Sequence, residues 1–283
     1  MKGLSRALLL RTGQRWIILF LAYVPLLLND PGRVAADTKA YLYLNPGRLL
    51  ESATSMWQPE VAMGTVTHQN IGYLWPIGPF YWVSDILGMP DWVAQRLWLG
   101  TVLAVAGLGV RWLLRTLRWS DSEIAGGGVL VASLAYMLSP YLLNYVDRHS
   151  VILLPWAGLP WMIGLTVRSV RTPGWRYPAA FGLVTMTIGG VNASSLLLVG
   201  LGPAVWLVWC GFERSVSWRR VLGTAVRMGL AFAATGVWWM VGLFVQAQHG
   251  LPTLRLTENY RVISDAATAP ELFRGLGYWY FYG

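Results

Sequence analysis

Long apolar runs alternate with short polar segments rich in Arg along most of this chain. A membrane-crossing α-helix needs about 20 mostly apolar residues, and seven runs approach that length. The pattern therefore predicts an all-α, polytopic transmembrane fold. The predicted spans are residues 14–29, 94–114, 124–143, 150–167, 178–191, 195–212 and 226–247.

Composition agrees with this fold class, because 55% of the residues are hydrophobic and 12% are charged. That leaves too little polar surface for a soluble globule of this length, so membrane lipids are the expected surroundings. The net charge of +9 raises the question of nucleic acid. The Arg residues lie in small clusters between apolar runs and not in one patch, which argues against a nucleic-acid partner. Cys210 has no second cysteine with which to form a disulfide or a zinc site.

The distribution of charge predicts an orientation, because cytoplasmic loops retain Lys and Arg. A cytoplasmic N-terminus places fourteen of the 22 Lys and Arg residues inside and ten of the 13 Asp and Glu residues outside. We therefore expect a multi-pass protein of the bacterial plasma (inner) membrane. Val34-Ala35-Ala36 resembles a signal-peptide cleavage site. The polar residues 29–33 and the spans that follow favour a retained signal-anchor helix instead.

The first extracytoplasmic loop, about residues 30–93, is much longer than a connection between spans requires, which is typical of a functional loop. Within it, Asn45-Pro46-Gly47 interrupts the chain, and residues 48–57 follow with an apolar helical face. This pattern predicts a helix lying in the membrane interface. The aromatic, Pro-rich residues 73–82 are expected at headgroup depth, where their rings could also stack on a sugar or a lipid.

Three stretches resemble the N-terminal membrane region of the arabinofuranosyltransferase D family, which are polyprenyl-phosphate-dependent GT-C glycosyltransferases of the mycobacterial envelope. They are Asp37 through Leu50, with the sequence Asp-Thr-Lys-x-Tyr-Leu-Tyr-Leu-x-Pro-Gly-Arg; His68-Gln69-Asn70 to Trp82; and Ser139-Pro140-Tyr141 to Pro160-Trp161. The resemblance implies a GT-C fold and transfer of arabinofuranose from decaprenyl-phosphoryl-arabinose to cell-wall arabinan with an α-(1→3) linkage. It also implies that residues 1–283 are the N-terminal part of a GT-C transmembrane domain whose C-terminal remainder is absent. The stop inside the aromatic run 277–283 agrees with a truncated chain.

A lipid-phosphate donor held at the membrane surface calls for an acid that deprotonates the acceptor hydroxyl and a cation that receives the phosphate. Members of the resembled family carry an essential acid just after the first span. The resemblance assigns that role to Asp37, with Asp30 second, and Glu258 could bring another carboxylate. The structural alternative is that Asp37 caps the helix that follows it, although Ala40 at the third position supplies no capping box.

Outward-facing Lys and Arg side chains are candidates to bind the donor phosphate, and other polar side chains are candidates to bind acceptor hydroxyls. Each cation could instead anchor the interface or pair with Asp147, Glu258 or Asp265; His68 could satisfy loop backbone, and His149 could be a helix-end residue. The substrate-binding candidates are Lys39, Arg48, His68, Arg148, His149 and Arg261, with Asp147-Arg148-His149 the preferred second site.

No metal ligands are assigned, because the three histidines are too scattered, and a divalent cation between Asp37 and the donor phosphate stays open. Two functions from other classes remain: a transporter or flippase of lipid-linked sugars, and a scaffold that binds envelope glycans without chemistry. A transporter favours ionisable residues near the middle of spans, whereas the predicted spans keep their charges near their ends. A scaffold would tolerate loss of Asp37. Protein partners and oligomeric state are not predicted.

Overall fold

Helices dominate the computed structural model, which describes residues 2–35, 37, 41–60, 63–66, 70–117, 127–146, 150–250, 261, 264 and 268–273. The elements, in chain order, are α1 (Lys2–Leu28), α2 (Tyr41–Leu44), α3 (Pro46–Ala53), β1 (Trp57–Gln58), β2 (Thr65–Val66), η1 (Asn70–Leu74), α4 (Ile77–Ile86), α5 (Asp91–Thr116), α7 (Gly127–Met137), α8 (Pro140–Tyr145), η2 (Ser150–Ile152), α9 (Leu153–Arg171), α10 (Arg176–Gly189), α11 (Ala193–Phe212), α12 (Trp218–His249) and α14 (Ala269–Phe273).

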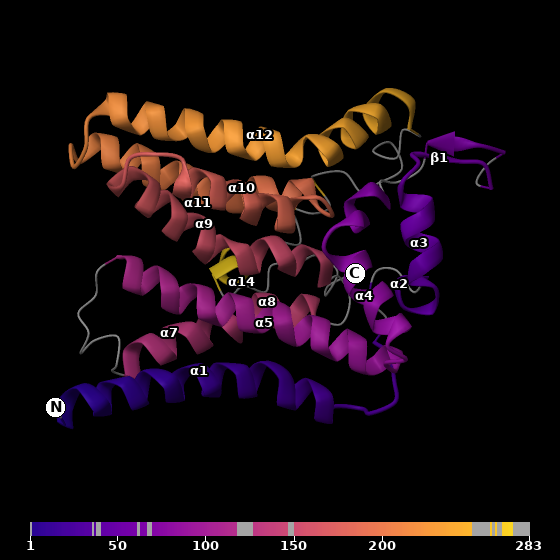
Figure 1. Ribbon diagram of the computed structural model, residues 1–283, viewed down its shortest axis with the longest axis horizontal. Helices are drawn as coiled ribbons and strands as arrows, with labels where there is room; N and C mark the ends of the chain where they lie inside the picture. Colours follow the sequence, from indigo (N-terminus) through magenta and orange to yellow (C-terminus); the bar gives the residue numbers. More distant parts are fainter. Residues whose placement is uncertain are drawn as a thin grey trace.

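The long helices form a bundle in which each helix packs on particular neighbours. α1 packs on α5, α5 on α9, α9 on α10, and α10 on α12, while α7 covers α5 and α11 covers α9 (Figure 1). The short elements α2, α3, β1 and α4 gather at one end of this bundle, where α1 ends and α5 begins (Figure 1). The first loop therefore sits on one end of the bundle.

Helix makes up most of the described residues in each predicted span, which confirms the all-α transmembrane fold class. Among the described residues, four helices are long and apolar enough to cross a membrane: α5, the continuous helix from Ser150 to Arg171, α11 and α12. Thr12–Leu28 and Gly127–Leu142 are shorter apolar helices, and α10 has 14 residues. The number of crossings stays a prediction.

The predicted third span, residues 124–143, is broken in the structure. Helix α7 ends at Met137, and α8 begins at Pro140. Ser139 has an extended backbone, with φ −63° and ψ 153°. Proline disfavours the helical conformation in the residue before it and lacks an amide hydrogen, so a new helix starts where that hydrogen is not needed.

The predicted interfacial helix over residues 48–57 differs from helix α3. Asn45 caps α3 by accepting a 3.0 Å hydrogen bond from the Arg48 amide, and the helix ends at Ala53. Its apolar residues Leu49 and Ala53 are buried, and α3 packs on η1 and α4. Trp57 lies beyond the helix, in strand β1, opposite Val66 of β2. The apolar face of α3 therefore packs on protein in place of lipid.

One glycine contact joins this loop to the bundle. A Cβ atom on Gly72 of η1 would lie 2.1 Å from the carbonyl oxygen of Gly190, in the turn between α10 and α11. Any side chain at this position would force the two backbones apart, so only glycine allows the close approach. The loop is thereby tied to the turn between two later helices.

Arginines join the helix ends at the other end of the bundle. Arg168 Nε donates to Thr116 Oγ1 at 3.3 Å, Arg171 Nη1 donates to the Thr116 carbonyl, and Arg220 Nη2 donates to the Arg171 carbonyl at 2.7 Å. These cations occupy the C-terminal ends of α5 and α9, where unpaired carbonyls and the helix dipole favour positive charge.

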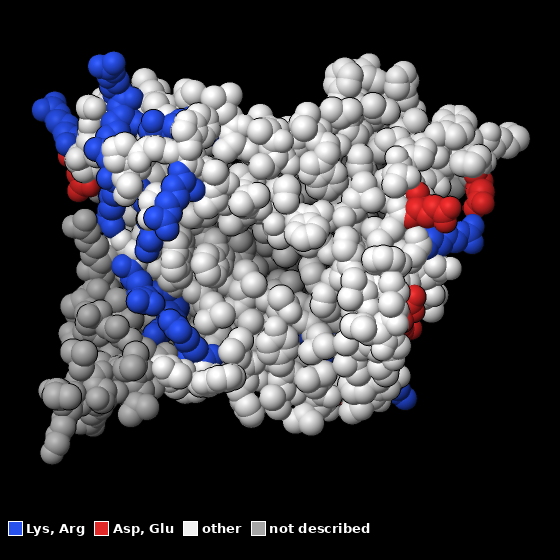
Figure 2. Space-filling view, in the orientation of Figure 1, with Lys and Arg blue, Asp and Glu red and all other residues white. Residues whose placement is uncertain are grey.

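Charge is separated along the bundle. Figure 2 shows Lys and Arg gathered at the end where α5 and α9 stop, a wide uncharged middle, and Asp and Glu mostly at the end that carries the first loop. This is the arrangement expected of a membrane protein whose basic end faces the cytoplasm.

Candidate active site

The segment that leads to Asp37 begins with a turn just after α1. Asp30 and Gly32 both have positive φ angles, 47° and 86°. Glycine adopts this conformation without steric cost, and Asp is among the few other residues that tolerate it. The Arg33 amide donates to the Asp30 carbonyl at 3.2 Å, which closes the turn.

Gln95 of α5 holds the next part of this segment through two hydrogen bonds to Ala35. The Ala35 amide donates to Gln95 Oε1 at 2.8 Å, and Gln95 Nε2 donates to the Ala35 carbonyl at 3.0 Å. The Asp37 amide donates to the same carbonyl at 2.8 Å. The Asp37 backbone is therefore bonded directly to Ala35, which Gln95 of α5 holds in place.

Arg96 extends this contact. Its Nη1 donates to Gln95 Oε1 at 2.8 Å, and its Nη2 donates to the Arg33 carbonyl at 3.3 Å. Gln95 is 1% exposed and Arg96 is 4% exposed. Burial of a guanidinium is costly unless its hydrogen bonds are replaced, and here a side-chain amide and a backbone carbonyl replace two of them.

Ser150 holds the Asp37 carboxylate from a different part of the bundle. The Ser150 amide donates to Asp37 Oδ1 at 3.0 Å, and the Ser150 hydroxyl donates to Oδ2. Ser150 opens η2, which runs into α9, so the carboxylate lies at the positive end of a long helix. The described hydrogen bonds of the Asp37 carboxylate thus cap η2 and α9, which are distant in sequence. The helix that follows Asp37 along the chain is α2, which begins at Tyr41.

A small cavity adjoins the carboxylate. About 10 Å³ is open to the centre of a water molecule there, enough for about one water. Asp37 itself is half-buried, so part of its surface stays exposed. The residues that line the cavity are Asp37, Leu42, Tyr43, Tyr73, Ile77, Tyr81, Trp98, Ser150 and Val151.

Two tyrosines from the loop stand beside Asp37 and stay neutral. Burial raises the pKa of Tyr43, and the negative charge of Asp37 raises it further, while a hydrogen bond with Gln95 lowers it. Burial also raises the pKa of Tyr81 well above its usual value, with smaller contributions from Tyr43 and Asp37. Their rings form an edge-to-face pair with centroids 5.3 Å apart. Both hydroxyls are therefore available as neutral hydrogen-bonding groups.

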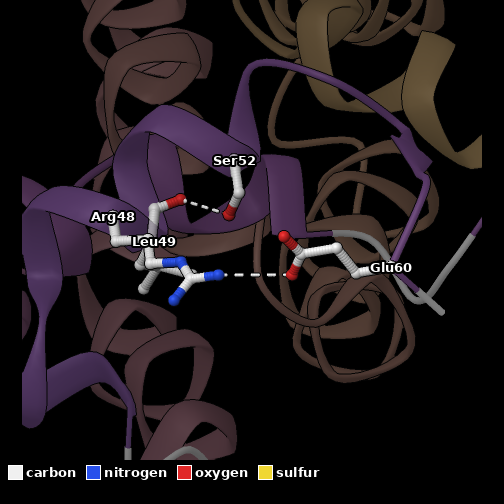
Figure 3. A network of polar contacts seen from close by, with 4 residues as sticks. All are labelled: Arg48, Leu49, Ser52 and Glu60. Atoms are coloured by element: carbon white, nitrogen blue, oxygen red, sulfur yellow. Dashed lines mark hydrogen bonds and ion pairs between the residues drawn. The ribbon is translucent and has the colours of Figure 1, made fainter.

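Asp30 and Arg48, both candidates from the sequence, do not line this cavity. Asp30 is exposed and lies 4.0 Å from Arg33. Arg48 Nη2 donates to Glu60 Oε2 at 3.2 Å, with both side chains largely exposed (Figure 3). Glu60 is not among the acidic partners expected from the sequence for such a cation, which are Asp147, Glu258 and Asp265. The structure therefore brings neither residue to Asp37.

The remaining candidates are placed only in part. Arg261 is exposed, and its carbonyl accepts a 3.1 Å hydrogen bond from the Ser264 hydroxyl. Five candidates lie outside the described residues: Lys39, His68, Arg148, His149 and Glu258. Their roles stay predictions.

Within the described part of the chain, no three His, Cys, Asp or Glu side chains are grouped so that they could hold a metal ion. Asp37 is the one carboxylate among the described residues that line the cavity. Any cation at this site would therefore need ligands besides the described side chains.

Sequence reasoning missed Gln95, Arg96 and Ser150, although two of them left a signal. Gln95-Arg96 is a polar pair inside the predicted span 94–114. A polar or charged residue inside a membrane span is expensive and usually functional, so this pair could have been singled out. Ser150 left no signal, because a serine at a span boundary is ordinary.

Comparison with known proteins identifies the family to which this chain is similar. The family described as "Alpha-(1->3)-arabinofuranosyltransferase, N-terminal GT-C domain" matches residues 21–282. The chain is 32% identical over 259 residues to the alpha-(1->3)-arabinofuranosyltransferase of Mycobacterium tuberculosis, covering 89% of this chain and 18% of that protein. It is 31% identical over 257 residues to the enzyme of the same name from Mycolicibacterium smegmatis, covering 89% of this chain and 17% of that protein.

A solved structure agrees in fold. The cryo-EM structure of arabinofuranosyltransferase AftD from Mycobacteria matches with a TM-score of 0.76 and 23% sequence identity, over 90% of this chain and 19% of that one. The present chain thus spans less than a fifth of the length of these curated relatives.

Proposed function

Because this chain belongs to the alpha-(1->3)-arabinofuranosyltransferase family, through its N-terminal GT-C domain, we propose that it forms the N-terminal part of the membrane core of an arabinofuranosyltransferase. The donor in this proposal is decaprenyl-phosphoryl-arabinose. The acceptor is a growing cell-wall arabinan, and the product linkage is α-(1→3). Residues 1–283 cross the plasma membrane about seven times, and further parts of the whole protein complete the enzyme.

The orientation proposed here puts the first loop outside the cell and the N-terminus in the cytoplasm. The separation of charge supports it, because Lys and Arg gather at the end opposite the loop (Figure 2). Asp37 and the loop helices then lie on the extracytoplasmic side, at the level where the head of a lipid-linked sugar is held.

Asp37 is the proposed general base. Its carboxylate accepts the proton of an acceptor hydroxyl while the hydroxyl oxygen bonds to C1 of the arabinofuranose. The bond between C1 and the phosphate oxygen breaks, and decaprenyl phosphate leaves with the bonding electrons. The Ser150 amide and hydroxyl hold this carboxylate in place during the step.

The observation that carries this proposal is the fixed position of the Asp37 carboxylate. It is half-buried, bonded to the start of a long helix and lined by two neutral tyrosines. A base held in one geometry needs no reorganisation when the acceptor arrives, which is how positioning lowers a barrier. For the leaving phosphate, Lys39, Arg48, Arg148 and Arg261 remain the proposed ligands, with His68 and His149 toward acceptor hydroxyls.

A transporter of lipid-linked sugars is the main rival function. Transport sites lie near the middle of the membrane, often on ionisable residues and broken helices. In α5, the charged residues Asp91, Arg96, Arg111 and Arg115 lie toward the two ends of the helix. This placement favours chemistry at the membrane surface over a transport site in the middle of the span.

Transfer of labelled arabinose from decaprenyl-phosphoryl-arabinose to an arabinan oligosaccharide tests the function. The whole protein in reconstituted membranes is compared with Asp37→Asn, and photo-crosslinking to the donor reports binding. Asp85→Asn is the matched control, because Asp85 is an exposed acid of α4 in the same loop. We expect Asp37→Asn to lower turnover by roughly 10²–10⁴-fold with donor binding kept. Wild-type turnover in Asp37→Asn would remove Asp37 as the base, and absence of transfer by the wild type would reject the enzyme.

A further inference from the structure

Gln95 and Arg96 of α5 form a hydrogen-bonded pair beside the segment that carries Asp37. The proposed reaction gives neither residue a role. Gln95 and Arg96 are nearly fully buried polar residues in the N-terminal turns of a long, otherwise mostly apolar helix. Buried polar groups cost stability unless every bond lost to water is replaced. Their described partners are each other, the backbone of the segment that carries Asp37, and, for Gln95, the Tyr43 side chain.

In the segment that carries Asp37, the two side chains bind backbone atoms. Gln95 bonds to both the amide and the carbonyl of Ala35, as a residue in a neighbouring β-strand would do. Arg96 binds the Arg33 carbonyl two residues earlier and also orients the Gln95 amide through its oxygen. Because these contacts use no side chain of the segment, they fix its path and not its composition.

The path fixed in this way ends at the carboxylate. The Asp37 amide donates to the Ala35 carbonyl, so the clamped residue is bonded to the Asp37 backbone. Ser150 then holds the side chain from the α9 side. The carboxylate is thus located by two anchors, one on α5 and one at the start of α9, which pack on each other in the bundle.

We infer that Gln95 and Arg96 are positioning residues that hold the Asp37 carboxylate at the distance from α9 that the transfer reaction requires. This inference rests on the proposed function, because it assigns a role in the same site. Neither residue lines the cavity beside Asp37. They act through the backbone of Arg33 and Ala35, so their loss lowers turnover more than it weakens donor or acceptor binding.

The first test measures geometry without activity. Hydrogen–deuterium exchange at the Ala35 and Asp37 amides is compared between wild type and Gln95→Met, which keeps the side-chain length and removes both hydrogen bonds to Ala35. Thr101→Val is the matched control on the same helix, since Thr101 Oγ1 bonds to Tyr23 of α1 and away from the segment. We expect faster exchange at both amides in Gln95→Met alone. Unchanged exchange in Gln95→Met overturns the inference.

The second test separates turnover from binding in the whole protein. We expect Gln95→Met to lower kcat by roughly 100-fold, the cost of a misplacement of about 1 Å, with KM for donor and acceptor within a few-fold. Gln95→Glu keeps the oxygen that accepts from Ala35 and Arg96, so it should recover part of the loss. Arg96→Lys, with one cationic donor in place of a fork, should lie between wild type and Arg96→Met. A loss confined to KM overturns the positioning role.

A double variant distinguishes failure of this inference from failure of the proposed function. If Gln95 acts only through Asp37, adding Gln95→Met to Asp37→Asn lowers the residual turnover no further. A full additional 100-fold loss would show an effect independent of Asp37 and reject the inference alone. Wild-type turnover in Asp37→Asn would reject the base and the positioning role together.

Discussion

The amide nitrogen of Ser150 lies 3.0 Å from Asp37 Oδ1, across a separation of 113 residues. This bond links the loop after the first helix to η2, which runs into α9. A carboxylate at a helix N-terminus is favoured by unpaired amides and by the helix dipole. The same bond therefore stabilises the junction and fixes the orientation of the proposed base, so capping and catalysis need not exclude one another.

Ser150→Ala tests how much the hydroxyl contributes to this orientation. The substitution removes one donor and keeps the amide bond, so we expect a loss of about tenfold in kcat, the equivalent of about 1.4 kcal/mol. Ser139→Ala, one helix earlier, is the control. Transfer kinetics in reconstituted membranes measure both variants, and a Ser150→Ala enzyme with wild-type kcat would show that the amide alone suffices.

Gly72→Ala tests the contact that joins the first loop to the turn after α10. The added Cβ would lie 2.1 Å from the Gly190 carbonyl oxygen, so the backbones must separate. We expect about 1–3 kcal/mol of destabilisation, as for other overpacked sites. Gly229→Ala is the control, because a Cβ there meets nothing within 4 Å in helix α12. Thermal unfolding in detergent gives both values, and equal midpoints would contradict the close approach.

The Arg48–Glu60 pair offers a test of Arg48 as a phosphate ligand. Both side chains are largely exposed, so the pair contributes at most about 1 kcal/mol to stability. If Arg48 binds the donor phosphate, Arg48→Gln raises the KM for donor, while Glu60→Gln frees the guanidinium and leaves that KM unchanged or lower. Equal donor KM in wild type and Arg48→Gln would assign Arg48 to the surface pair.

Alkaline pH should weaken the loop through Tyr43. Burial raises the pKa of Tyr43 above the usual value of 10. The unfolded chain therefore releases this proton first as pH rises, so the contribution of the neutral hydroxyl to stability is complete below pH 10 and is lost above it. Unfolding midpoints measured from pH 7 to 11 should fall less steeply above pH 10 in Tyr43→Phe. Parallel curves would exclude Tyr43 as the group responsible.

Cysteine labelling tests the orientation of the membrane core. The sequence contains one cysteine, Cys210, which is buried and can be replaced by serine. In that background, Glu60→Cys lies at the acidic end and Arg214→Cys at the basic end. We expect a membrane-impermeant maleimide to label Glu60→Cys in intact cells and Arg214→Cys only after permeabilisation. The reverse pattern would invert the topology and move Asp37 to the cytoplasm.

The sequence by itself determined where the helices of this protein lie and which loop carries acid. Lipid offers no hydrogen bonds to a backbone, so an apolar run of sufficient length must form helix, and the pattern of residues is enough to predict it. The break at Pro140 was within reach of the same local reasoning, because proline acts on its immediate neighbours. The choice of Asp37 as the candidate base came from resemblance, and its role stays a prediction.

Only the tertiary structure decided which groups surround that carboxylate. Ser150, Gln95 and Gly72 each act through a partner far away in sequence, and hydropathy records nothing about such partners. Helices that are alike in composition can pack in several orders, and the order of α1, α5, α9 and α10 brings these groups together. Their pairing follows from side-chain shape and hydrogen bonding across helices, which exist only once the bundle has formed.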